Sequence, residues 1–197
     1  MKNNVINAFD CVSKIYEETS FMLKDFTEII SNHKYELITG ENTIGYVSKK
    51  IDYYQYWLAR YCSLFFKLQD QQETYPLLSI TAGFYNLESK SVEPYLILGV
   101  VEGMEHEKAS WDYWWLFSPF FNEKDVFDYV NYETHEILES APGINRNPVK
   151  FKCRYTNDSY NWPKKGVFFS EPLLSVSSHK DIESLAQETI HLWNDYV

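Results

Sequence analysis

A long amphipathic pattern at the start of the chain constrains the fold more than any other feature. Side chains of apolar character, with one threonine, alternate at intervals of four and three residues: Val5, Phe9, Val12, Tyr16, Thr19, Leu23, Phe26 and Ile30. A second row widens this stripe beyond a coiled-coil seam: Ala8, Ile15, Met22 and Ile29. No Gly or Pro occurs before Gly40. The pattern predicts one helix of about 28 residues, about 40 Å long.

A helix of this length either spans the sheet on which it packs or extends beyond it. Apolar surface that extends beyond the sheet favours pairing between helices of two copies. We therefore predict a homodimer formed through the N-terminal helix.

From Tyr35 to about Val101 the chain consists of short segments rich in aromatic and branched residues. These segments are YELIT, YWLARYCSLFFKL, YPLLSITAGFY and PYLILGVVEG, with the polar stretches GENTIG, QDQQE and ESKSVE between them. Short polar connections favour antiparallel strands, because parallel crossovers need a dozen or more residues. Residues 53–68 fit a helix face as well as a strand, so both interpretations stay open there.

The second half of the chain predicts two further helices and two strands. Asn122 can cap a middle helix whose apolar side is Val126, Tyr129, Val130 and Ile137, and the APG stretch from Ala141 ends it. VKFKCRY and GVFFSEPLLSVSS are typical of strands. Ser178-His179-Lys180-Asp181 resembles a capping box and predicts the start of a C-terminal helix. Its predicted inward residues are Ile182, Leu185, Ala186, Thr189, Ile190 and Trp193.

Together these elements predict a single α+β domain over residues 1–197. We expect a largely antiparallel sheet of about five to seven strands, with a long N-terminal helix, a middle helix and a C-terminal helix on one face. The length is sufficient for one sizeable core.

Charge and cysteine usage limit the possible partners. The formal net charge is −10, and basic residues group only at Lys49-Lys50, Lys164-Lys165 and the sparse run Lys150, Lys152 and Arg154. This disfavours nucleic acid as a partner. The three cysteines form no CxxC pair, and no apolar run approaches the length of a membrane span. We expect a reduced, cytoplasmic location, no membrane association, and neither a metal nor a cofactor.

The stretch WDYWWLFSPFF, residues 111–121, is the strongest candidate for a binding surface. In a strand, Trp111, Tyr113 and Trp115 point to one face and Trp114 to the other, so both faces carry large rings. One interpretation is a strand buried on both faces, and the other is a binding surface to which Arg60 adds orienting polarity. The sequence leaves this choice open.

Enzymatic signatures are weaker. The chain has no P-loop, GxGxxG, GxSxG or HExxH motif. Glu102, Glu105 and His106 could bind a divalent cation, and Glu88-Ser89-Lys90 has the Glu-x-Lys spacing of metal-dependent nucleases, although no Pro-Asp dipeptide precedes it. Glu188 and His191 form a single ExxH, whereas a di-iron bundle needs two.

The preferred prediction is a non-enzymatic cytoplasmic binding module that recognises a protein partner or a small apolar ligand through an aromatic-rich surface. The alternative is a metal-dependent hydrolase or nuclease that uses Glu102, Glu105, His106, Glu88 and Lys90.

Overall fold

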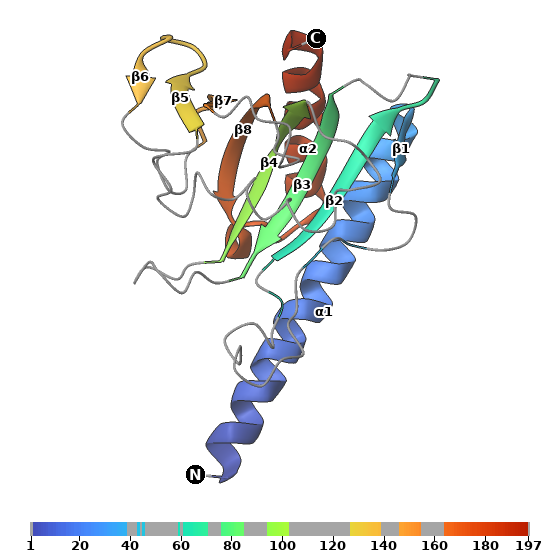
Figure 1. The fold of residues 1–197 in the computed structure, drawn as a ribbon. Helices are drawn as coiled ribbons and strands as arrows, with labels where there is room; N and C mark the ends of the chain where they lie inside the picture. Colours follow the sequence, from blue (N-terminus) through green and yellow to red (C-terminus); the bar gives the residue numbers. More distant parts are fainter. Residues whose placement is uncertain are drawn as a thin grey trace.

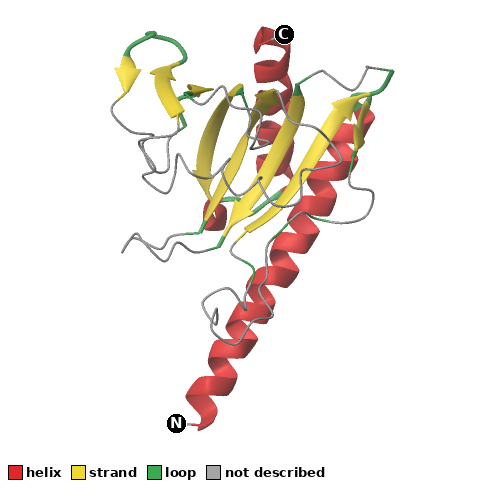
Figure 2. Cartoon of the chain, in the orientation of Figure 1, coloured by secondary structure: helices red, strands yellow, loops and turns green. Residues whose placement is uncertain are grey.

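Eight strands form one antiparallel sheet within the described residues, and two helices pack on one of its faces (Figures 1 and 2). The structure is a computed structural model that describes residues 2–38, 43, 45, 59, 61–70, 76–84, 94–102, 127–138, 146–154 and 164–196. The helices are α1 (Lys2–Asn32) and α2 (His179–Tyr196), with a short 3-10 helix η3 (Leu173–Ser175) before α2. The strands are β1 (Tyr35–Leu37), β2 (Tyr61–Leu68), β3 (Leu77–Gly83), β4 (Tyr95–Glu102), β5 (Phe127–Asn131), β6 (Ile137–Leu138), β7 (Val149–Cys153) and β8 (Lys165–Pro172).

The strand order is β1-β2-β3-β4-β8-β7-β5-β6. The first four strands follow one another in sequence, whereas β8, the last strand of the chain, lies between β4 and β7. This insertion places two lysine-bearing strands, β7 and β8, side by side.

The N-terminal helix predicted from the amphipathic pattern is confirmed. It is α1, which runs unbroken for 31 residues, about 46 Å. It ends at Asn32, and Lys34, two residues further on, has a left-handed φ of 67°. Its buried residues begin at Thr19, and the turns before them project beyond the lower end of the sheet (Figure 1). Of the two alternatives that its length left open, the helix therefore extends beyond the sheet.

The helix-covered face of the sheet is a continuous apolar layer. Leu64, Ile80, Leu98 and Phe169 stand directly opposite one another across β2, β3, β4 and β8, and all are buried. The side chains that cover this layer come from both helices: Met22, Leu23, Phe26 and Ile30 of α1, and Ile182, Leu185, Ala186, Ile190, Leu192 and Trp193 of α2. Burial of this apolar area is the main stabilising contribution to the fold.

The opposite face is buried too, but its composition differs. The next row across the sheet is Phe65, Ser79, Gly99 and Phe168. A Cβ atom at Gly99 would lie 2.2 Å from the carbonyl oxygen of Val167 on β8, so glycine is required for this close strand approach. Of the described helices, neither covers this face (Figure 1).

The predicted α+β class and antiparallel sheet are confirmed. Of residues 53–68, for which helix and strand were both open, Tyr61–Leu68 form a strand, and residues 53–58 and 60 lie outside the described residues. The sheet has eight strands rather than five to seven, within the described residues. All six residues predicted to face inward from the C-terminal helix are buried.

The predicted middle helix is wrong over residues 127–138, which form the hairpin of β5 and β6. The side chain of Asn131 ends β5, since its Oδ1 accepts hydrogen bonds from the backbone N–H groups of Glu133 and Thr134, both at 2.9 Å. His135 then adopts a φ of 59°. These turn features exclude a continuous helix, although Tyr129, Val130 and Ile137 have helical spacing.

Candidate functional site

An open pocket lies between α1 and the segment that leads from β8 into α2. Its volume is about 470 Å³, within the range of small-molecule sites. Its apolar lining is Ile15, Phe21, Met22, Leu173, Leu174, Val176 and Ile182, and its polar lining is Cys11, Lys14, Glu18, Thr19, Asp25, Ser177, Ser178 and His179. We call this set of residues the interhelical pocket.

Two large apolar side chains of the pocket are exposed to solvent. Phe21 lies on the outward side of α1, and Leu174 lies in η3. Neither belongs to the apolar stripe from which the core was predicted. An isolated aromatic residue on the polar side of a helix, such as Phe21, is the sequence signal by which this site could have been found.

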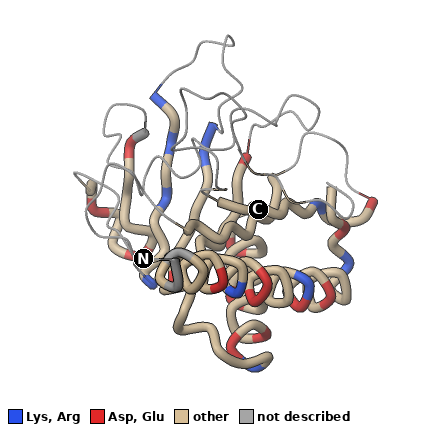
Figure 3. Tube along the Cα trace, turned by 90° about the horizontal axis from the view of Figure 1, so that it is seen from below, with Lys and Arg blue, Asp and Glu red and all other residues tan. Residues whose placement is uncertain are grey.

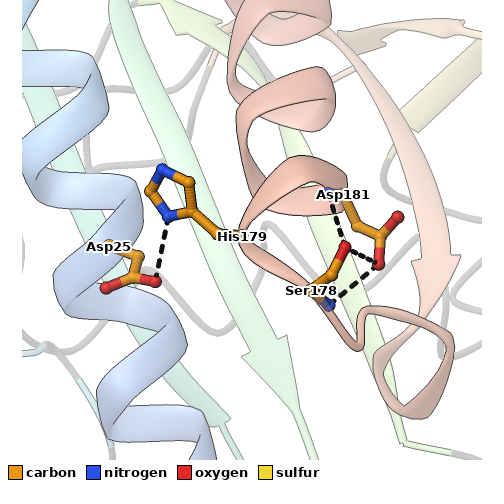
Figure 4. Close-up of polar contacts among 4 residues, drawn as sticks. All are labelled: Asp25, Ser178, His179 and Asp181. Carbon is orange, nitrogen blue, oxygen red and sulfur yellow. Dashed lines mark hydrogen bonds and ion pairs between the residues drawn. The ribbon is translucent and has the colours of Figure 1, made fainter.

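One polar contact joins the two helices at this pocket. His179 Nδ1, at the start of α2, lies 3.4 Å from Asp25 Oδ2 on α1 (Figure 4). Both side chains are exposed, so water screens the pair and its contribution to stability is small. The contact orients His179 at the edge of the pocket.

The predicted capping box at the start of α2 is confirmed (Figure 4). The backbone N–H of Asp181 donates to Ser178 Oγ at 3.2 Å, and Asp181 Oδ2 accepts from the backbone N–H of Ser178 at 2.9 Å. Hydrogen bonds from Ser178 and Ser177 hold the pKa of the Asp181 carboxyl below its usual value. The cap therefore fixes where α2 begins, and with it the position of His179.

The pocket brings together a cysteine, a histidine and an aspartate, the residue types of a nucleophilic triad. Cys11 and Asp25 both lie on α1, fourteen positions apart, which separates them by about 21 Å along the helix axis. His179 contacts Asp25, so it cannot also be within hydrogen-bonding distance of Cys11. Cys11, His179 and Asp25 therefore do not form a triad in this arrangement.

The overhang of α1, residues 2–14, carries exposed apolar side chains outside the pocket. Phe9 is 67% exposed and Ile6 is 48% exposed. Phe9 continues the stripe that is buried further along the same helix. An exposed apolar stripe on a helix is a common feature of protein–protein interfaces.

Of the predicted catalytic and binding residues, only Glu102 lies within the described residues. It ends β4, where its Oε2 lies 2.9 Å from Lys165 Nζ and accepts a 3.4 Å hydrogen bond from the Tyr196 hydroxyl. Burial and the neighbouring Glu102 carboxylate raise the pKa of Tyr196. These contacts give Glu102 a structural role at the end of α2.

The other predicted site residues lie outside the described residues: Glu88, Lys90, Glu105, His106, Arg60, Trp111, Tyr113, Trp114 and Trp115. The choice between buried strand and binding surface for residues 111–121 therefore stays a prediction. Among the residues that the structure does describe, no group of three or more His, Cys, Asp and Glu side chains could hold a metal ion.

In the single ExxH motif, the glutamate forms an ion pair with an arginine. Glu188 Oε2 lies 3.1 Å from Arg146 Nη2, and Arg146 Nε also lies 3.2 Å from Glu171 Oε2. Burial raises the pKa of Glu188, and the Arg146 guanidinium partly offsets that effect. Arg146 thus bridges Glu171 of β8 and Glu188 of α2.

Comparison of this chain with protein-family models, with curated proteins and with solved structures gives no match. Neither described helix has the combination of length and apolar character needed to cross a bilayer.

Proposed function

We propose that the chain is a protein-interaction module that associates with a second copy of itself through the overhang of α1. The observation that carries this proposal is the solvent exposure of Phe9 and Ile6 on a helix that continues beyond the sheet. Burying one such side chain contributes about 1.5–3 kcal/mol, so a pair of overhangs gains several of these contributions. The aromatic stretch of residues 111–121 remains a second predicted surface of the same module.

The apolar stripe of the helix favours a second copy as the occupant. In an antiparallel pair of helices centred on Val12, the stripe of each copy faces the stripe of the other. The same arrangement places Phe9 opposite Ile15. Because the pair is symmetric, each favourable contact occurs twice, as expected for an isologous dimer.

Sedimentation velocity over a range of concentrations tests the proposal. We expect a reversible dimer for the native chain and at least about tenfold weaker association for Phe9→Asp. Ile137→Asp is the matched control, since Ile137 is 86% exposed on β6, away from α1, and its replacement should leave association unchanged.

A native chain that stays monomeric at millimolar concentration contradicts the proposal, as does a Phe9→Asp variant that associates like the native chain.

A further inference from the structure

The interhelical pocket has a buried apolar floor and exposed apolar side chains from two different elements. Phe21 of α1 is 54% exposed, and Leu174 of η3 is 67% exposed. Met22, Leu173 and Ile182, which line the same pocket, are buried. The apolar surface of the pocket therefore continues outward into solvent on both sides.

The pocket is also long. Its lining on α1 runs from Cys11 to Asp25, fourteen positions or about 21 Å. A helix of about 14 residues has the same length, and amphipathic helices bind in grooves through apolar anchors on one face. A small molecule is instead held inside a cavity that encloses most of its surface. The shape of the pocket therefore suits a helical segment of a protein.

Carboxylates surround Phe21 on the surface of α1. Side chains three and four positions apart are neighbours on a helix, and at these positions around Phe21 stand Glu17, Glu18, Lys24 and Asp25. Within the described residues, no cation lies at salt-bridge distance from Glu17 or Glu18. Lys24 Nζ already lies 5.7 Å from the centre of the Phe21 ring. Figure 3 shows acidic segments recurring along α1.

The lining of the pocket has the same excess of negative charge. It contains the carboxylates of Glu18 and Asp25 and one ammonium group, that of Lys14. The apolar groove is therefore bordered by more negative than positive charge, which favours an occupant with basic side chains.

This surface is distinct from the α1 overhang. Phe21 lies twelve positions after Phe9, which is about 120° around the helix, so a helix pair that buries Phe9 uses another face of α1. The helix is unbroken as far as Asn32, so the overhang cannot fold back onto the pocket of its own chain. The occupant of the pocket therefore comes from another molecule.

We propose that the interhelical pocket binds a basic amphipathic helix of a partner protein. The apolar side chains of that helix contact Phe21, Leu174 and the buried floor, and its lysines or arginines lie opposite Glu17 and Glu18. The net charge of −10 also attracts a basic partner, so the local and the overall charge agree. An acidic segment or an anionic membrane surface is repelled by both.

Fluorescence anisotropy tests the inference with a labelled peptide of about 14 leucines and lysines, arranged to give one apolar helix face. We expect the native chain to bind this peptide with an affinity that falls as salt rises. Phe21→Gln should weaken binding about tenfold. Phe9→Gln is the matched control, because it makes the same exchange on another face of α1, and it should change binding less than about twofold.

A second pair of variants tests the charge. Glu17→Gln combined with Glu18→Gln should weaken binding about fivefold and reduce its dependence on salt. Glu133→Gln combined with Glu136→Gln removes the same charge from exposed positions in the hairpin of β5 and β6, and should change binding less than about twofold. All of these positions are exposed, so each variant should melt close to the native chain.

Four results would overturn the inference. The first is that the native chain does not bind the leucine–lysine peptide. The second is equal weakening by a variant and its matched control, which would reflect non-specific adsorption or net charge alone. The third is tighter binding of a matched leucine–glutamate peptide. The fourth is loss of self-association in sedimentation of Phe21→Gln, which would make a second copy the occupant of the pocket.

Discussion

The two halves of α1 have the same apolar spacing and opposite environments. In the covered half, Phe26 and Ile30 are fully buried against the sheet and α2, whereas Phe9, on the same stripe in the overhang, is 67% exposed. The sheet and α2 provide a partner only for the covered half (Figure 1). Periodicity therefore predicts which face of a helix is apolar, and the rest of the fold decides how much of that face is buried.

The largest expected effect of this difference is on the free energy of unfolding. Phe26→Ala removes a fully buried ring and leaves a cavity, so we expect a loss of about 3–5 kcal/mol in urea or guanidinium unfolding. Ile137→Ala, at an exposed position, should change the free energy by less than about 0.5 kcal/mol. A Phe26→Ala loss below about 1 kcal/mol would show that the covered half of α1 is not part of the core.

The strand that follows the covered half of α1, β1, should make stability sensitive to high pH. Tyr35 follows α1, packs edge-to-face on Trp193 at 5.4 Å, and burial raises its pKa to about 12. The unfolded chain ionises near pH 10, so stability is fully present below about pH 10 and falls as pH rises toward about 12, by up to about 3 kcal/mol. Unfolding titrations between about pH 9 and 11 should show a steeper decline in the native chain than in Tyr35→Phe; parallel declines would be inconsistent with the burial of this hydroxyl.

Tyr16 marks the boundary between the two halves. Its hydroxyl donates a 2.9 Å hydrogen bond to the carbonyl of Ala59, and its ring packs edge-to-face on Phe84 at 4.7 Å. Tyr16→Phe keeps the ring contact and should cost about 1 kcal/mol in chemical unfolding. Tyr16→Ala removes both contacts and should cost more, and similar losses in the two variants would mean that the ring contributes little.

The smallest effect on unfolding is expected in the overhang. Phe9→Ala should change the free energy of unfolding of the monomer by less than about 0.5 kcal/mol, because the ring is exposed. The same variant should weaken self-association measurably. A large loss of monomer stability would mean that the overhang packs on its own chain, which removes the contrast between the halves.

The parts of the fold set by local chemistry could be predicted from the sequence. Both described helices follow from 3.6-residue periodicity, and the start of α2 follows from the pairing of Ser178 with Asp181. The hairpin at residues 127–138 was missed because a few apolar residues fit both periods. There the side-chain hydrogen bonds of Asn131 decide the structure.

The candidate surfaces depend on long-range pairing, which one sequence does not reveal. The interhelical pocket exists because η3, directly after Pro172, adds Leu173 and Leu174 to a lining that α1 shares. This arrangement leaves no local pattern in the sequence. The length of the predicted helix likewise left open whether it extends beyond the sheet, so the exposure of Phe9 is known only from the structure.

A distance between the two copies tests the central claim most directly. Cys11 is exposed in the overhang, so a spin label can be attached there in a variant that lacks the partly buried thiols, Cys62→Ala with Cys153→Ser. Paired helices pack with axes about 8–10 Å apart, and an antiparallel pair centred on Val12 brings the two labelled positions close together. We predict a short intermolecular distance by pulsed electron paramagnetic resonance that disappears in Phe9→Asp. No intermolecular coupling at high concentration would contradict self-association through α1.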